Sequence, residues 1–76
     1  MPEVFEHEDE IVVTLEMPPA VADAVRVTVE MGLLLITSEG DQPYRREVAL
    51  PCAVDGSRME VAYEDGTLHI TLPKAR

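Results

Sequence analysis

Apolar and polar residues alternate over most of this chain, and that period of two is the feature that most restricts its fold. The alternation is cleanest over residues 25–31, Val-Arg-Val-Thr-Val-Glu-Met, where every odd position is apolar. Successive side chains of a β-strand point to opposite faces, so this stretch predicts a strand whose apolar face includes Met31. A helical period of 3.6 residues hardly occurs. The pattern therefore favours an all-β protein.

Turn-forming residues divide the alternating pattern into short strands. Strands are predicted over residues 10–17, 25–31, 33–37, 44–50, 59–63 and 68–72. A short helical turn is expected over residues 20–24, after Pro18-Pro19, and a loop over residues 38–43. Asp65-Gly66 suits a type I′ turn or a bulged loop, because glycine tolerates a positive φ. Six or seven short strands with one long connection, residues 52–58, indicate an all-β sandwich.

The core of this fold must be small. At 76 residues the chain is predicted to form one domain, residues 1–76. Residues 33–36, Leu-Leu-Leu-Ile, have no polar position, so their strand is predicted to be buried on both faces. Cys52 is the single cysteine, which excludes an internal disulfide. No His or Lys lies beside it in the sequence, so we expect it to be a small packing residue and not a nucleophile.

The charge of the chain excludes several classes of partner. Fifteen acidic residues against six basic ones give a formal charge of −9 at pH 7. This charge repels phosphate groups, so we expect no binding to nucleic acid or to anionic membranes. No apolar run approaches the roughly 20 residues that span a bilayer, and the acidic start of the chain has no signal-peptide core. Together with the single cysteine, these features favour a cytoplasmic protein.

Residues that could support catalysis or metal binding are scattered. His7 and His69 lie far apart, and each is expected to be a surface or structural histidine. The acidic run over residues 6–10 lacks the central glycine and the ligand spacing of a calcium loop. It is predicted to be a solvated strand edge, whose charge discourages aggregation. None of the common catalytic or phosphate-binding motifs is found, so we expect no enzyme activity, no metal and no cofactor.

A set of short motifs lies in a fixed order between Val4 and Lys74. The motifs are Met17-Pro18-Pro19, Val25-Arg26-Val27-Thr28-Val29, Leu35-Ile36, Tyr44-Arg45-Arg46-Glu47-Val48-Ala49-Leu50-Pro51, Val54-Asp55, Val61-Ala62-Tyr63-Glu64-Asp65-Gly66-Thr67-Leu68 and Leu72-Pro73-Lys74. In this order they resemble the P-G, V-x-V, L-x-I and F-x-R-x-F-x-L-P motifs, the Val-Asp connection, and the A-x-x-x-N-G-V-L and L-P-K motifs of the small heat-shock protein, or α-crystallin domain, family. Departures from that pattern include Pro19 at the Gly of P-G, and Val61, Asp65 and Thr67 at the Ala, Asn and Val of A-x-x-x-N-G-V-L.

The resemblance implies an immunoglobulin-like β-sandwich of about seven antiparallel strands, ATP-independent chaperone activity and no cofactor. The family's long N-terminal arm and its I-x-I tail are not expected in this chain, in which two residues follow Lys74. The segment between Ile36 and Tyr44 is too short for the loop and strand that some members exchange when they dimerise. We therefore expect weak holdase activity and self-association as a dimer or a small oligomer.

The resemblance also implies where partners bind. The strands over residues 25–31 and 59–63 would border the groove that receives I-x-I segments in the family. The candidate groove residues are Val25, Val27, Val29, Met59, Val61 and Tyr63. An alternative interpretation is that these residues are ordinary sandwich core.

Arg46 matches the family's interface arginine, which makes Arg46 and Tyr44 candidates for a dimer interface. An ordinary exposed arginine that pairs with a nearby carboxylate is the alternative. The expected partners are extended apolar segments of unfolding proteins or of a partner protein. A second hypothesis is a docking module of the same fold, comparable to the domain attached to arsenite-pump-type ATPases or to CS-type co-chaperone domains.

Overall fold

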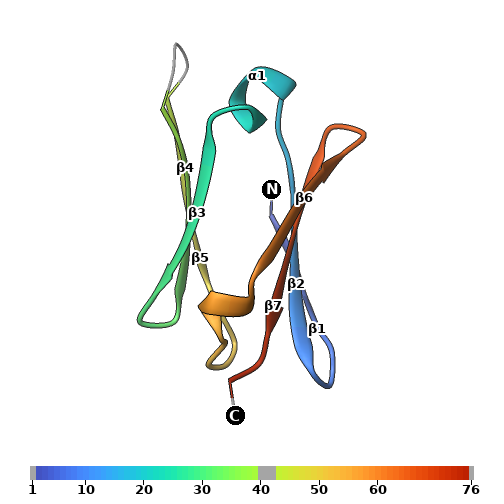
Figure 1. Cartoon of the computed structure of the whole chain (residues 1–76), viewed down its shortest axis with the longest axis vertical. Coiled ribbons are helices and arrows are strands. Elements are labelled where there is room, and N and C mark those ends of the chain that lie inside the picture. The colour runs from blue at the N-terminus through green and yellow to red at the C-terminus, as the bar shows by residue number, and fades with distance from the viewer. Residues whose placement is uncertain (1, 40–42, 76) are drawn as a thin grey trace.

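The computed structural model describes residues 2–39 and 43–75, which form seven strands and two short helical turns (Figure 1). The strands are β1 (Glu3–Glu6), β2 (Glu10–Glu16), β3 (Val25–Glu30), β4 (Leu33–Ser38), β5 (Tyr44–Ala49), β6 (Glu60–Glu64) and β7 (Thr67–Pro73). One turn of α-helix, α1 (Pro19–Ala22), joins β2 to β3. One 3-10 turn, η1 (Gly56–Arg58), lies between β5 and β6. Neither described helix has the length or the apolar character of a membrane-spanning helix.

The strands form two antiparallel sheets that face each other. One sheet has the order β1-β2-β7-β6 and the other the order β3-β4-β5. Figure 1 shows α1 near one end of the sandwich and η1 near the other, so each turn lies where the chain crosses between the sheets. This architecture confirms the predicted all-β sandwich of about seven antiparallel strands.

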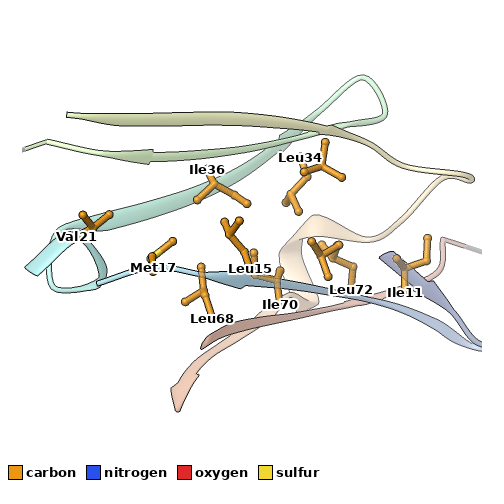
Figure 2. Packing of buried hydrophobic residues seen from close by; sticks show 11 residues of the cluster. Ile11, Leu15, Met17, Val21, Leu34, Ile36, Leu68, Ile70 and Leu72 are labelled. Atoms are coloured by element: carbon orange, nitrogen blue, oxygen red, sulfur yellow. The ribbon is translucent and has the colours of Figure 1, made fainter. Parts of the chain in front are cut away.

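The core lies between the sheets and is built from alternate positions of the strands. In the centre of the larger sheet, Ile11 lies opposite Leu72 and Val13 opposite Ile70, and all four side chains are fully buried. Figure 2 shows Ile70 and Leu72 on the side of the larger sheet that faces Leu34 and Ile36 of the smaller sheet. The buried hydrophobic cluster comprises Ile11, Val13, Leu15, Met17, Val21, Leu34, Ile36, Val48, Leu68, Ile70 and Leu72. Burial of each large aliphatic side chain stabilises the fold by about 1.5–3 kcal/mol.

The turn between β3 and β4 corrects one sequence prediction. Met31 was expected on the apolar face of its strand, but β3 ends at Glu30 and Met31 is fully exposed. Met31 and Gly32 form the two-residue turn, with φ of 50° and 81°. A type I′ turn requires a positive φ at both central residues, and this conformation points Met31 away from the core. The strict alternation therefore ends one residue earlier than the sequence indicates.

The strand β4 is buried on one face only, which corrects the prediction of burial on both. Leu34 and Ile36 are fully buried, whereas Leu33 is 43% exposed and Leu35 is half-buried. Leu33 and Leu35 point to the outer face of the smaller sheet, which no other described element covers. Burial of these two side chains would need a further layer of structure on the outer face of the smaller sheet. An apolar run in the sequence does not show whether such a layer is present.

Ser38 belongs to β4 and not to the predicted loop over residues 38–43. Its side chain is buried, and its hydroxyl donates a hydrogen bond of 3.0 Å to the carbonyl oxygen of Val21 in α1. This bond satisfies a polar group that burial would otherwise leave without a partner. The remainder of the predicted loop includes residues 40–42, which lie outside the described residues.

The first strand, β1, was absent from the sequence predictions. It pairs with β2, and the acidic run over residues 6–10 includes the turn between them. The His7 N–H donates to the Glu10 carbonyl oxygen at 2.8 Å, which closes this turn. Most of the run is exposed as expected, but only Glu6 and Glu10 lie in strands. The acidic residues are therefore mainly a hairpin turn and not a strand edge.

Candidate functional site

The strands β3 and β6 are the outermost strands of their sheets on one side of the sandwich. Among the described residues, β3 pairs only with β4, and β6 only with β7. An outermost strand leaves every second backbone N–H and C=O without a ladder partner, so it can accept an additional strand. We call this side, formed by β3, β6 and Met59, the open edge of the sandwich (Figure 1).

The three candidate valines of β3 line the inner face of the smaller sheet. Val25, Val27 and Val29 lie opposite the three buried residues of β4, so they point toward the core. All three are half-buried and pack against the buried cluster. The valines therefore serve as core residues at the margin of the sandwich, as the core interpretation proposed. Their remaining exposed surface lies at the open edge.

The candidate residues of β6 are more exposed. Val61 lies opposite Ile70 and Tyr63 opposite Leu68, which places both on the inner face of the larger sheet. They are nevertheless 44% and 37% exposed. The smaller sheet has three strands against four in the larger one, so it does not cover β6 completely. Met59, just before β6, is half-buried against the core.

One end of the open edge is held by Tyr63. Its hydroxyl donates a hydrogen bond of 2.7 Å to the carbonyl oxygen of Met17, just before α1. The Met17 N–H in turn donates to the Gly66 carbonyl oxygen at 3.1 Å. These bonds tie the β6–β7 hairpin to the crossing between the sheets. The Tyr63 ring is therefore fixed at the surface instead of moving freely.

The other end of the open edge is held by η1. The Asp55 Oδ1 accepts hydrogen bonds from the Ser57 hydroxyl at 2.6 Å and from the Ser57 N–H at 3.1 Å. These two bonds hold the pKa of the Asp55 carboxyl below its ordinary value. A Cβ at Gly56 would lie 3.5 Å from the Val29 Cβ, so η1 approaches β3 closely. The segment that leads into β6 is thus packed against β3.

A hollow lies beside β6, and only Val61 among the residues that line it was predicted to belong to a binding site. It has a volume of about 480 Å³ and is lined by Glu60, Val61, Ala62, His69 and Thr71. Four of the five belong to the outer face of the larger sheet, where Ala62 lies opposite His69. The small Ala62 between two large apolar residues was the signal in the sequence, because a methyl side chain leaves room on its face of the strand.

The structure separates Arg46 and Tyr44 from the open edge. Both lie on the inner face of β5, the outermost strand on the other side of the smaller sheet. Arg46 is exposed and has no ion-pair partner within residues 2–39 and 43–75. The carboxylate pair expected for it belongs instead to Arg45, whose Nη2 lies 3.3 Å from the Glu47 Oε2.

The remaining candidates form no reactive centre in the described part of the chain. His7 is exposed, and His69 is half-buried on the outer face of the larger sheet. Cys52 is half-buried and packs against the core, as expected for a packing residue. No three His, Cys, Asp or Glu side chains of the described residues gather as metal ligands would.

Comparisons with solved structures identify the same fold in other proteins. Heat shock protein 16.0 from Schizosaccharomyces pombe is 26% identical, with a TM-score of 0.84 over 100% of this chain and 86% of that one. The HspA structure from Xanthomonas axonopodis is 21% identical, with a TM-score of 0.84 over 97% of this chain and 91% of that one. A small heat-shock protein from Xylella fastidiosa is 21% identical, with a TM-score of 0.76 over 100% and 87%.

Comparison with family models gives the same assignment from sequence. A search of curated proteins found no match. The model described as the Hsp20/alpha crystallin family matches residues 3–76. That match covers nearly the whole chain and agrees with the resemblance seen in the motifs. The chain belongs to the Hsp20/alpha crystallin family of small heat-shock proteins.

Proposed function

We propose that residues 1–76 act as one ATP-independent chaperone domain that holds extended apolar segments at the open edge. Membership of a family of non-enzymatic chaperones supports a chaperone-type role. The observation that carries the location is the exposure of Val61 and Tyr63 on the inner face of an outermost strand. These two side chains extend the apolar surface of the core to the open edge, where a partner can contact it.

Binding would occur by addition of a strand. An extended segment beside β6 can form main-chain hydrogen bonds with the free N–H and C=O groups of that strand. Every second side chain of the segment would then contact Val61 and Tyr63 and cover their exposed surface. The main-chain bonds do not depend on side-chain identity, so one site can hold many unfolding proteins. Neither step requires hydrolysis of a nucleotide.

The test is suppression of aggregation of a heat-labile client enzyme, followed by light scattering. The wild-type chain should reduce scattering, and Val61→Asn should reduce it much less because the variant loses apolar contact. Thr28→Asn is the matched control, since Thr28 lies on the outer face of β3. Absence of suppression by the wild-type chain at molar excess would contradict the proposal, as would equal activity of both variants.

A dimer interface at β5 is a separate part of the proposal. Two observations on the described residues support it. β5 is an outermost strand of the smaller sheet, so no described strand pairs with its far edge. The guanidinium of Arg46 is exposed and has no ion-pair partner among the described residues. Arg46→Glu should shift the chain from dimer to monomer in sedimentation velocity. Arg45→Glu, on the opposite face of the same strand, should leave the sedimentation coefficient unchanged. A monomeric wild-type chain would refute the interface.

A further inference from the structure

The outer face of the smaller sheet carries an apolar row that no other described element covers. The row consists of Met31, Leu33 and Leu35, along the central strand β4 and the turn before it. We propose that this face docks one amphipathic helix of a partner protein. The face lies apart from the open edge, so the inference goes beyond the proposed function and does not depend on it.

Met31 is the residue that points most directly to a contact with a partner. Its apolar side chain is fully exposed, and its φ of 50° lies in the left-handed region. Asparagine is the preferred residue at this position of a type I′ turn. Met31 thus adds nothing to the core and strains the turn, and strained residues gather at functional sites. Methionine is also frequent at binding surfaces, because its flexible side chain adapts to different shapes.

A hollow beside this row continues the apolar surface. It has a volume of about 200 Å³ and is lined by Glu30, Met31, Leu33, Leu35, Arg45 and Glu47. Leu33 is 43% exposed and Leu35 is half-buried, so a partner can reach both. An aliphatic side chain of a docked helix can enter the hollow and contact the row there.

The shape of the apolar row favours a helix over a second sheet. The row is one strand wide, because the outward side chains of β3 and β5 are polar apart from Ala49. These polar residues are Arg26, Thr28 and Glu30 on β3, and Arg45 and Glu47 on β5. A second sheet would bury them together with the row, at a cost in desolvation. The apolar stripe of an amphipathic helix covers a single row and leaves its neighbours at the rim.

The dimensions of the face also suit one helix. Three neighbouring strands measure about 10 Å from the first to the third, which is close to the diameter of a helix with its side chains, roughly 10–12 Å. β3, β4 and β5 have six residues each, so the face is about 20 Å long. A helix of about 14 residues has this length.

The charge of the face permits a close approach in spite of the acidic chain. The strands of the larger sheet have only glutamates as charged residues on their outer face, and no lysine or arginine. They are Glu3, Glu10, Glu16, Glu60 and Glu64. The outer face of the smaller sheet instead has two arginines and two glutamates, so its formal net charge is zero.

The order of these charges along the strands selects the charges of the helix. Arg26 and Arg45 both lie beside Thr37 at one end of the face, and Glu30 lies beside Leu33 near the other end. A helix with acidic residues in its first turn and basic residues in its last turn complements these two ends. The same arrangement stabilises a helix through its own dipole. An ordinary stable amphipathic helix therefore fits the face.

A labelled helical peptide tests this inference. Its sequence is Glu-Glu-Leu-Ala-Glu-Leu-Leu-Ala-Lys-Leu-Ala-Ala-Lys-Lys, with a lactam bridge between the central Glu and Lys that holds it helical. Fluorescence anisotropy should show binding to the wild-type chain, and a peptide with serine at the four leucines should not bind. In NMR spectra the leucine peptide should shift the amide signals of Leu33, Leu35 and Glu47 and leave those of Val61 and Tyr63 unchanged.

Met31→Asn separates binding from folding. The variant loses an apolar contact but suits the turn better, so it should bind the leucine peptide at least roughly tenfold more weakly without loss of stability. Phe5→Asn is the matched control, because Phe5 is 45% exposed on the outer face of the larger sheet. It should bind the peptide as tightly as the wild-type chain. Equal weakening by both variants would assign the effect to general hydrophobicity and overturn the inference.

The charges are tested by the double variant Arg26→Glu with Glu30→Arg. It keeps the net charge of the chain and reverses the order of charges along β3. At low salt it should bind the leucine peptide severalfold more weakly than the wild-type chain does, and the difference should shrink as salt screens the charges. An unchanged affinity would contradict the proposed charge pattern of the helix.

The remaining outcomes distinguish this surface from the open edge. Val61→Asn should bind the leucine peptide like the wild-type chain, whatever its effect on client aggregation. Absence of binding, amide shifts confined to β6, or an unchanged affinity of Met31→Asn would each overturn the inference. Shifts of the Leu33 and Leu35 amides on dilution of the chain alone would place a second copy on this face, and would overturn it as well.

Discussion

Tyr63 combines two roles within one residue. Its ring is part of the apolar surface at the open edge, and its hydroxyl donates the 2.7 Å hydrogen bond to the Met17 carbonyl oxygen. An exposed ring that bound partners without this bond would have to be immobilised on binding, at a cost in side-chain entropy. The hydrogen bond already fixes the ring in the folded domain before a partner binds.

The two roles can be separated by Tyr63→Phe. The variant removes only the hydroxyl, so we expect the free energy of unfolding to fall by about 1 kcal/mol. Urea denaturation would measure the change. Tyr44→Phe is the control, because the Tyr44 hydroxyl makes no side-chain hydrogen bond within residues 2–39 and 43–75. An equal loss in both variants would show that the bond to Met17 contributes nothing specific.

Met31 is the residue whose backbone conformation is least suited to its side chain. Its φ of 50° lies in the left-handed region, where a side chain with a Cβ is disfavoured and asparagine is better tolerated than most residues. Asn-Gly is the preferred pair for a type I′ turn. Met31→Asn should therefore raise the free energy of unfolding by roughly 0.5–1 kcal/mol, a typical gain for a corrected turn residue. Thermal denaturation would measure it, and Met31→Leu should give no gain.

At the scale of elements, the sequence predicts the strands whose buried and exposed faces alternate. β3 and β7 were found because one face of each packs on the core. β1 was missed because it contains only Val4 and Phe5 between acidic residues, and both remain largely exposed at the margin of the sheet. Its stability comes from pairing with β2, which no local pattern reveals.

The candidate site was predictable only in part for the same reason. The apolar rows of β3 and β6 follow from alternation and from the family resemblance. The difference in exposure between the half-buried Val27 and the more exposed Val61 depends on how far one sheet covers the other. That coverage is a property of two sheets of unequal width, and neither strand encodes it alone.

The hydrogen bonds of η1 should make the free energy of unfolding depend on pH in the acidic range. The pKa of Asp55 is lower in the folded chain because its carboxylate accepts hydrogen bonds from Ser57. A group with a lowered folded pKa stabilises above its unfolded pKa, and this stabilisation is lost as the pH falls through the folded pKa. Asp55→Ala should therefore be less stable than the wild-type chain near neutral pH. The difference should disappear in strong acid.

Chemical denaturation at a series of pH values would follow this difference. Ser57→Ala provides the graded comparison, since it removes the hydroxyl donor and keeps the N–H donor to Asp55. The free energy of unfolding of Ser57→Ala should differ less from that of the wild-type chain than the free energy of unfolding of Asp55→Ala does. A constant difference in the free energy of unfolding between Asp55→Ala and the wild-type chain across the whole pH range would contradict this role of the Asp55 carboxylate.

At the scale of the whole molecule, stability depends on a single small core. Domains are stabilised by roughly 0.05–0.15 kcal/mol per residue, so the total free energy of unfolding of a chain of this size is small. Ile70 is fully buried in the central strand β7. Ile70→Ala should cost about 2–5 kcal/mol and Ile70→Val about 0.5–1.5 kcal/mol. Urea denaturation should order the variants in this way, whereas Thr71→Ala on the outer face should change little.

The pairing of β2 with β7 has a consequence for the order in which the chain can fold during synthesis. Ile11 lies opposite Leu72, so an early strand depends on one made more than half the chain later. Such distant pairing slows folding, because a long loop must close before the contacts form. A ribosome-bound nascent chain that stops before Thr67 should therefore be digested readily by protease, and one extended well past Pro73 should resist. A member of a chaperone family would itself be an unfolded client until its seventh strand emerges.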